Sequence, residues 1–329
     1  MRQADGHEAN GDGLGRSGER LSIVIPTFNC AQYLGDTLRS LQAQGSRIDG
    51  AEILVVDDCS TTDDPEAVVR ELWGDRVTFM RHEHNVGPTR NFNACLERAG
   101  REWIHILHGD DFVFPGAYEE FAACLDVTPD ATAIFSRIVY VDADRVWLRL
   151  SERLGITPRG TLEYVPAMWG ANVLQFAGVL VSKRAVAAVG GFDETFSHVA
   201  DYNLWWRLAS RTRVAYTNVC VGAYRHFEGN HTSTLRRTAR NLLEHVQQVQ
   251  HVEHSMRDDG SWSPQARRAL YAPVTTRALR QTRDYVRDAA AFDAHDRVLA
   301  MLPLSPRSQA RRAELRLRRW AHSATDRGR

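Results

Sequence analysis

Cysteine is scarce in this sequence and shows no metal-binding or redox pattern. The chain of 329 residues has five cysteines, and no two lie at C-x-x-C or metal-ligand spacing. An odd, scattered set in a chain of this size indicates reduced thiols in a cytosol-like compartment. The cysteines are Cys30, Cys59, Cys95, Cys124 and Cys220.

Net charge and long apolar runs are also absent. The 41 basic and 41 acidic residues cancel, so no overall field favours nucleic acid, and we expect no nucleic-acid partner. The longest apolar candidate, residues 173–181, is interrupted by Gln175 and Gly178 and cannot span a bilayer. We expect a soluble, cytoplasmic protein, at most peripheral at the inner membrane face. Residues 1–20 are polar and glycine-rich, which predicts a disordered leader.

Short apolar runs alternate with helical periodicity through the first hundred residues. The segments 21–25, 52–56, 76–80 and 103–107 are rich in aliphatic residues, which predicts buried strands. The segments between them carry apolar residues at helical spacing. Such alternation with short links predicts an α/β fold, with a mainly parallel, twisted sheet and helices on both faces.

From about residue 130 the pattern becomes mixed, and from about residue 235 it is helical to the end. Strands are predicted at 132–141, 174–182 and 214–224, and helices at 185–189 and 201–210. We predict an α/β domain over 21–232 and a C-terminal helical extension over 233–329. Residues 307–329 carry eight arginines against two acidic residues, a net charge of +6. This basic tail is either a solvated arm or a peripheral membrane or partner contact.

Polar side chains follow three of the predicted strands where each strand ends. Residues 26–29 (PTFN) follow the first strand, residues 57–60 (DDCS) the second and residues 108–111 (HGDD) the fourth. The carboxyl ends of parallel strands lie side by side, so we expect these groups to line one crevice. Each segment alone could be a turn or a helix cap. Their joint occurrence favours a nucleotide site.

The segment 108–111 places two adjacent carboxylates, Asp110 and Asp111, at the end of a buried strand. A buried carboxylate pair is costly unless a cation or strong hydrogen bonds neutralise it. Oxygen ligands at such a point suit a hard divalent cation that holds a phosphate. The alternative is a surface turn, in which Asp is common.

The first predicted strand is not followed by a glycine-rich loop. Dinucleotide-binding folds and P-loops need glycines there for close approach of the backbone to phosphate. The same absence disfavours a sugar nucleotidyltransferase, which stays open as an alternative.

Four segments, taken together and in order, resemble family 2 glycosyltransferases. They are residues 21–29 (LSIVIPTFN), 55–61 (VVDDCST), 85–91 (NVGPTRN) and 109–115 (GDDFVFP). The resemblance covers roughly residues 20–230. It implies the GT-A fold, a single Rossmann-like α/β domain that binds a nucleotide-sugar, with a UDP-sugar the first expectation. The implied reaction moves the sugar to an acceptor hydroxyl with inversion and depends on a divalent cation.

Carried over position by position, the resemblance assigns a donor site. Thr27, Asn29 and Asp58 match positions near the base and ribose, and Arg90 matches a base-side or phosphate-side donor. Asp110 matches the last Asp of the DxD element, whose carboxylate holds Mg²⁺ or Mn²⁺ on the diphosphate. The expected nucleotide-sugar-binding residues are Pro26, Thr27, Asn29, Asp58, Asn85, Arg90, Asp110 and Asp111.

The sequence departs from the family pattern at the first DxD position, where His108 stands. An imidazole can donate a hydrogen bond or ligate Mn²⁺, but it supplies no fixed negative charge. We therefore expect Asp110 and His108 as metal ligands and Mg²⁺ or Mn²⁺ as the cofactor. The alternative is that His108 only caps a backbone group.

A later stretch resembles the family's GGFDE and ED segments, at residues 190–194 and 200–201. Asp201 is the expected catalytic base, because in an inverting displacement the acceptor hydroxyl must lose its proton, and a carboxylate within hydrogen-bond reach can take it. Its alternative role is a helix cap or first-turn charge. Ala200 replaces the usual Glu. Asp193, Glu194 and Trp205 are expected to bind the acceptor, Trp205 by stacking on a sugar ring.

The acceptor is a glycan, a glycolipid or a small molecule, and the family setting favours cell-surface polysaccharide or glycolipid assembly over natural-product glycosylation. Residues 224–231 resemble the family's late loop, so His226 or His231 could reach the diphosphate. The C-terminal helices suit a peripheral membrane contact or a homodimer. A scaffold that binds a nucleotide-sugar without catalysis is the remaining alternative, prompted by His108 and Ala200.

Overall fold

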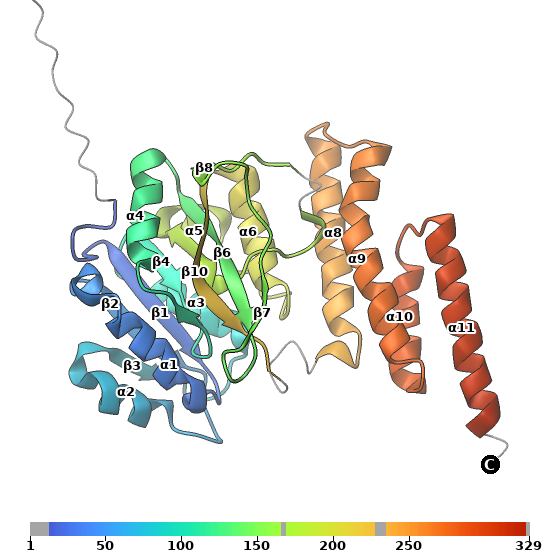
Figure 1. Ribbon diagram of the computed structural model, residues 1–329, viewed down its shortest axis with the longest axis horizontal. Coiled ribbons are helices and arrows are strands. Elements are labelled where there is room, and N and C mark those ends of the chain that lie inside the picture. Colours follow the sequence, from blue (N-terminus) through green and yellow to red (C-terminus); the bar gives the residue numbers. More distant parts are fainter. Residues whose placement is uncertain (1–12, 166–168, 228–234, 327–329) are drawn as a thin grey trace, which may run out of the picture. The chain divides into compact units, whose positions relative to one another are not determined.

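The computed structural model describes residues 13–165, 169–227 and 235–326 (Figure 1). Two compact units divide the chain. The first holds the described parts of 1–163, 173–197 and 204–226, and the second holds those of 164–172, 198–203 and 227–329. The predicted domain boundary at residue 232 lies outside the described residues. Two short segments that we expected in the first domain, 164–172 and 198–203, cluster with the C-terminal helices instead.

A ten-stranded sheet organises the first unit (Figure 1). Its order is β3-β2-β1-β4-β9-β6-β10-β5, with β7 on β6 and β8 on β10. Neighbours among β3, β2, β1 and β4 pair in parallel, and β9 lies antiparallel between β4 and β6. The strands are β1 (Leu21–Thr27), β2 (Glu52–Asp57), β3 (Thr78–Arg81), β4 (Trp103–Ile106), β5 (Phe112–Val113), β6 (Ala133–Val141), β7 (Trp147–Leu150), β8 (Arg159–Thr161), β9 (Val179–Ser182) and β10 (Val214–Arg225).

Helices cover both faces of this sheet. Leu34, Leu38 and Leu41 of α1 recur at helical spacing and are buried in one core with Ile23 of β1 and Phe121 of α4. On the other face, α3 packs on β1 and β2. The helices are α1 (Ala31–Gln42), α2 (Pro65–Trp73), α3 (Pro88–Arg98), α4 (Ala117–Val127), α5 (Lys183–Val189) and α6 (Ala200–Arg211), with 3₁₀ turns at Gly45–Ile48, Gly74–Arg76 and Phe176–Gly178.

The predicted disordered leader over residues 1–20 is wrong for its last part. Residues 1–12 lie outside the described residues. Residues 13–20 are placed, and Leu14 is fully buried in the core that contains Leu125. Arg20 pairs with Glu102 beside β4. The stretch from residue 13 is therefore held by apolar burial, which its polar composition concealed.

In the described part of the second unit the long helices are α8 (Arg240–Asp258), α9 (Pro264–Asp284), α10 (Ala289–Ala300) and α11 (Pro306–Asp326). A buried carboxylate, Glu253 of α8, accepts hydrogen bonds from four side chains of this unit: Arg257, Trp262, Arg267 and Tyr271. The basic tail forms α11, and two of its arginines, Arg312 and Arg316, pair with Asp296. Among the described residues, no helix is both long and apolar enough to cross a membrane.

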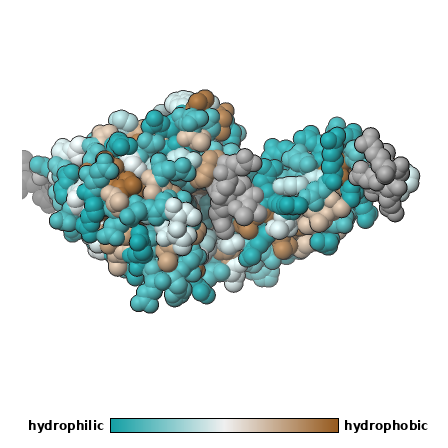
Figure 2. Space-filling model, turned by 90° about the horizontal axis from the view of Figure 1, so that it is seen from below, coloured by the Kyte–Doolittle hydropathy of each residue, from teal (hydrophilic) through white to brown (hydrophobic). Residues whose placement is uncertain are grey.

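Hydrophilic residues predominate on the face shown in Figure 2, and apolar residues are scattered over it. The apolar side chains of β1, β2 and β4 are instead buried between the helices. This burial fixes the positions at which the three strands end, and those ends carry the residues considered next.

Candidate active site

The ends of β1, β2 and β4 are tied together by backbone hydrogen bonds. Thr27 of β1 lies beside Asp57 of β2 in register, and the amide of Asp58 donates to the carbonyl of Thr27 at 2.8 Å. The amide of Gly109, beyond β4, donates to the carbonyl of Pro26 at 3.2 Å. The polar segments after the three strands therefore share one edge of the sheet, as the sequence predicted.

Asp58 organises the loop that leads into α3. Its carboxylate accepts hydrogen bonds from the amides of Val86 at 2.7 Å and Gly87 at 3.0 Å. The side-chain amide of Asn85 donates to the Asp58 carbonyl at 3.1 Å. Burial raises the pKa of Asp58, and the two amides oppose that shift. Two residues predicted to bind the donor, Asp58 after β2 and Asn85 before α3, are thus joined by a hydrogen bond between their loops.

Thr27 and Asn29 also form hydrogen bonds at this edge of the sheet. The Thr27 hydroxyl donates to Asp57 at 3.2 Å, and Asp57 also pairs with Arg81 at 2.8 Å. Asn29 has a φ of 50°, and its side-chain oxygen accepts from the amides of Thr61 and Thr62. Asn and Asp tolerate this left-handed conformation better than other non-glycine residues. Both side chains therefore shape the first two loops, and donor binding by them stays a prediction.

A three-residue cluster stands at the end of β4. One nitrogen of His108 and one carboxylate oxygen each of Asp110 and Asp111 lie within 4.8 Å of one another. The His108 ring lies against Phe92 and Phe176, with ring centroids 5.0 and 4.2 Å away. Among the buried atoms of the described residues, His108 Nε2 and Asp111 Oδ2 have no hydrogen-bond partner.

The electrostatics of this cluster suit a cation. Burial lowers the pKa of His108 to about 3, so its ring is neutral near pH 7 and keeps a lone pair. Burial raises the pKa of Asp110 to about 6 and, together with the charge of Asp110, raises the pKa of Asp111 well above its usual value. A divalent cation would relieve both the desolvation and the repulsion. Two carboxylate oxygens and an imidazole nitrogen fit Mn²⁺, whereas Mg²⁺ prefers oxygen ligands alone.

The backbone of the cluster is clamped from α1. The hydroxyl of Thr37 donates to the carbonyls of Gly109 at 3.0 Å and Asp111 at 2.6 Å. A Cβ on Gly109 would lie 2.7 Å from Thr27 Cγ2 and 2.8 Å from Cys30 Sγ. Sequence reasoning missed Thr37, and no local signal reveals it, because its partners lie more than 70 residues along the chain.

Asp193 and Glu194, which were expected to bind the acceptor, form polar contacts with other residues of the first unit. Glu194 pairs with Arg90 at 3.0 Å on the surface. The carboxylate of Asp193 accepts from the amide of Thr195 at 2.9 Å and from its hydroxyl at 2.7 Å. Acceptor binding by Asp193 and Glu194, and donor binding by Arg90, stay predictions.

The expected stacking role of Trp205 is wrong. Its side chain is 1% exposed and lies against Phe135, Phe176 and Phe192, so no ring face is available to a sugar. Trp206 is also buried. Both faces of α6 are covered at this point, a fact that helical spacing alone could not reveal.

Asp201 belongs to the second unit and lies in the first turn of α6. One carboxylate oxygen accepts from the Asn172 side chain at 2.8 Å, and the other accepts from the Tyr202 amide at 2.7 Å. Burial raises the pKa of Asp201 to about 6, against the opposing effect of these hydrogen bonds.

Two histidines were predicted to reach the diphosphate. His226 is exposed just beyond β10, and His231 lies outside the described residues.

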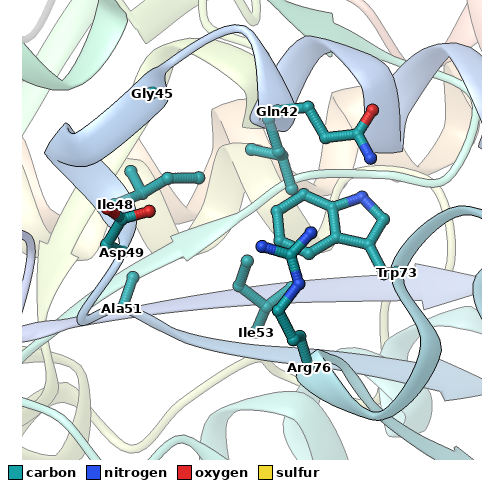
Figure 3. A pocket seen from close by; sticks show the side chains of 9 residues that line it. Gln42, Gly45, Ile48, Asp49, Ala51, Ile53, Trp73 and Arg76 are labelled. Atoms are coloured by element: carbon teal, nitrogen blue, oxygen red, sulfur yellow. The ribbon is translucent and has the colours of Figure 1, made fainter.

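A separate surface pocket of about 430 Å³ lies away from this edge (Figure 3). Ala51 and Ile53, at the start of β2, line it together with Trp73 and Arg76. The Arg76 guanidinium carbon lies 4.7 Å from the centroid of the Trp73 ring. Because the site residues follow the other end of β2, this pocket is not part of the candidate active site.

Comparison with known proteins decides the family. The family model described as glycosyl transferase family 2 matches residues 22–190, which is more than half of the chain. The chain belongs to this family. A family 2 glycosyltransferase is an enzyme, which argues against the scaffold alternative prompted by His108 and Ala200. The matched residues include the ends of β1, β2 and β4 and the His108 cluster.

Curated relatives of this glycosyltransferase match it over different lengths. An uncharacterized protein of Mycobacterium tuberculosis is 29% identical over 238 residues, which is 68% of this chain and 72% of that protein. The GalNAc(5)-diNAcBac-PP-undecaprenol beta-1,3-glucosyltransferase of Campylobacter jejuni is 35% identical over 101 residues, 30% of this chain and 32% of that enzyme. An uncharacterized glycosyltransferase of Rickettsia felis is matched over only 31% of its length.

Solved structures support the GT-A fold. S. aureus TarS 1–349, in complex with UDP-GlcNAc, has a TM-score of 0.57 and 18% identity, with 94% of this chain and 92% of that chain covered. The mannosyltransferase PcManGT from Pyrobaculum calidifontis, in complex with GDP-Man and Mn²⁺, has a TM-score of 0.51 and 18% identity, with 92% and 80% covered. The predicted fold class, a GT-A α/β sheet followed by C-terminal helices, is confirmed. The sheet is mixed and not mainly parallel as predicted, since β9, β7, β8 and β5 pair antiparallel with their neighbours.

Proposed function

We propose that this glycosyltransferase moves a sugar from a nucleotide-sugar to an acceptor hydroxyl with inversion, using a divalent cation bound by His108, Asp110 and Asp111. The observation that supports the cation is the cluster itself, in which three ligand atoms converge and two buried atoms have no protein partner. When bound, the cation would neutralise charge on the departing diphosphate.

The proposed donor site follows the same edge of the sheet. The loops that contain Thr27, Asn29 and Asp58 lie beside the cluster, because hydrogen bonds link them to the ends of neighbouring strands. Among the structural neighbours, TarS is described with UDP-GlcNAc and PcManGT with GDP-Man and Mn²⁺. We propose a UDP-sugar as donor, and GDP- and dTDP-sugars are the competing choices that an experiment must separate.

The proposed base is Asp201. Its buried carboxylate has a pKa of about 6, so it is largely ionised near pH 7 and still basic enough to accept a proton. The Asn172 amide and the Tyr202 amide fix its orientation. The acceptor is proposed to be a glycan or a lipid-linked glycan, the class named for the Campylobacter jejuni relative.

Donor binding tests the first part of this proposal. Thermal-shift titrations with UDP-, GDP- and dTDP-sugars, each with and without Mn²⁺, should show one nucleotide class whose binding requires the metal. Asp110→Asn should remove the Mn²⁺-dependent part. The matched control is Asp75→Asn, since the Asp75 side chain is 99% exposed. Equal donor affinity with and without Mn²⁺ in the wild-type enzyme contradicts the proposed role of the cation.

Turnover tests the base. Asp201→Asn should keep Mn²⁺-dependent donor binding and lower kcat by roughly 10²-fold or more, because general base catalysis contributes about 10²–10⁴-fold. The anomeric configuration of the product, read by NMR, should be opposite to that of the donor. Retention of configuration or near-normal turnover of the variant excludes Asp201 as the base of an inverting reaction.

A further inference from the structure

Arg225, the last residue of β10, contacts both acidic residues of the cluster from inside the protein. Its side chain is 1% exposed. Its Nε donates to the carbonyl of Asp110 at 2.8 Å, and its backbone amide donates to Asp111 Oδ1 at 2.9 Å. Neither contact uses Asp111 Oδ2, which has no hydrogen-bond partner. Arg225 therefore fixes the segment and leaves that oxygen free for a ligand.

The rest of the guanidinium is anchored to two other elements. One NH₂ group donates to Asp36 of α1 at 2.9 Å, and the other donates to the carbonyl of Ala143 at 2.6 Å. The guanidinium carbon lies 4.6 Å from the centroid of the Tyr33 ring. A buried cation needs a counter-charge and hydrogen bonds. Asp36 supplies the charge, and the planar fork of an arginine reaches all three acceptors at once.

Contacts from two sides restrain every carbonyl of the segment 109–111. Thr37 of α1 donates to the carbonyls of Gly109 and Asp111, and Arg225 donates to the carbonyl of Asp110. The charge of Arg225 also opposes the rise in the pKa of both carboxyl groups. The segment thus has little freedom to move, and its ligand atoms keep their mutual geometry before any cation arrives.

We propose that Arg225, anchored by Asp36, is a positioning residue that holds Asp110 and Asp111 in the geometry required to bind the divalent cation. This inference rests on the proposed function, in which the cluster binds Mn²⁺. The late loop was expected to act through an imidazole that reaches the diphosphate. The contribution assigned here comes from the arginine, which faces away from solvent and acts through the metal-binding segment.

Mn²⁺ binding to the full chain without donor tests the inference, with free Mn²⁺ measured by electron paramagnetic resonance. Arg225→Lys keeps the positive charge but loses the planar guanidinium group that reaches three acceptors at once. We expect the Mn²⁺ affinity of this variant to fall at least tenfold. The matched control is Arg145→Lys, because Arg145 also pairs with Asp36, at 3.1 Å, but its side chain is 58% exposed. We expect the control to bind Mn²⁺ within twofold of the wild type.

A second variant, Asp36→Asn, removes the counter-charge at nearly constant volume and should also weaken Mn²⁺ binding. In turnover assays both variants should recover most of kcat at high Mn²⁺, while the Mn²⁺ concentration for half-maximal activity stays raised. A purely structural role would instead lower the amount of folded protein, measured by circular dichroism, and leave the affinity of the folded fraction unchanged.

The outcomes separate this inference from the function on which it rests. If Arg225→Lys folds and binds Mn²⁺ as tightly as the wild type, the positioning role is refuted and the metal site stands. If Arg225→Lys does not fold, Asp36→Asn decides by the same criterion. If the wild-type chain binds no Mn²⁺, the proposed metal site fails, and the positioning role fails with it.

Discussion

Replacing Gly109 with alanine should displace the metal-binding segment. The new Cβ would lie 2.7 Å from Thr27 Cγ2 and 2.8 Å from Cys30 Sγ, whereas carbon atoms in contact prefer about 3.5–4.0 Å. Thr27 and Cys30 are both buried, and Thr27 is held by Asp57. Because the end of β1 cannot yield easily, the segment at residue 109 has to move by about 1 Å.

A displacement of this size has two measurable consequences. Overpacking a buried site costs typically about 1–3 kcal/mol of unfolding free energy. Metal-ligand distances tolerate only about 0.2 Å, so a shift of about 1 Å should lower Mn²⁺ affinity at least tenfold. Urea unfolding followed by tryptophan fluorescence measures the first effect, and electron paramagnetic resonance measures the second.

Gly35→Ala in α1 is the matched control. Its Cβ would meet only the end of the flexible Arg39 side chain, at 3.1 Å. Alanine is favoured over glycine inside a helix by about 0.5–1 kcal/mol, so the control should gain stability and keep its Mn²⁺ affinity. A Gly109→Ala variant with wild-type stability and wild-type Mn²⁺ affinity would refute the close-packing argument.

Two further predictions concern buried carboxylates of the second unit. Burial raises the pKa of Glu253, but its four hydrogen bonds outweigh that effect and lower the pKa from 4.5 to about 2. Its stabilising contribution is therefore present above pH 4.5 and lost as the pH falls toward 2. Glu253→Gln should lower the unfolding free energy at pH 7 by about 2–3 kcal/mol. The control Asp258→Asn, at an exposed side chain, should lower it by at most about 0.5 kcal/mol. Equal urea unfolding midpoints for the two variants refute this prediction. As Asp201 must be ionised to act as a base, log kcat/KM at saturating Mn²⁺ should rise with pH up to about 6 and then level, and a flat profile between pH 5 and 7 contradicts that role.

The sequence determined the layout of the first unit and the edge that carries the site. Alternating aliphatic runs and helical spacing predicted β1, β2 and β4, because strands buried on both faces are largely apolar. The run at 76–80 also indicated β3, but this edge strand is exposed or half-buried, not buried as predicted. Polar residues can follow a buried strand only where it leaves the core. The sequence alone therefore predicted that Asp58 and the 108–111 segment lie at the ends of buried strands.

The chain's membership of its family was also readable from sequence, since the motifs at 21–29 and 109–115 are local. Departures from the family pattern were visible as well, at His108 and Ala200. What the motifs did not reveal is how each residue is engaged. Asp58 and Asn29 bind backbone amides of other loops, 28 to 33 residues along the chain, and only the folded chain brings those amides within reach.

Burial of individual aromatic residues was decided by tertiary packing. Helical spacing allowed either Trp205 or Trp206 to face outward, and both are buried because more than one face of α6 is covered. The same holds for Leu14, which composition assigned to a disordered leader and packing placed in the core. The sequence of a single helix or segment does not show which other elements pack against it.

The clamp around the metal-binding segment depended on tertiary structure alone. Arg225 and its counter-ion Asp36 are 189 residues apart, and Thr37 lies 72 residues from Gly109. Each of these residues is locally unremarkable in the sequence. Their effect arises because β10, α1 and the end of β4 meet in a buried volume, where an unpaired charge is costly and every contact therefore constrains its partners.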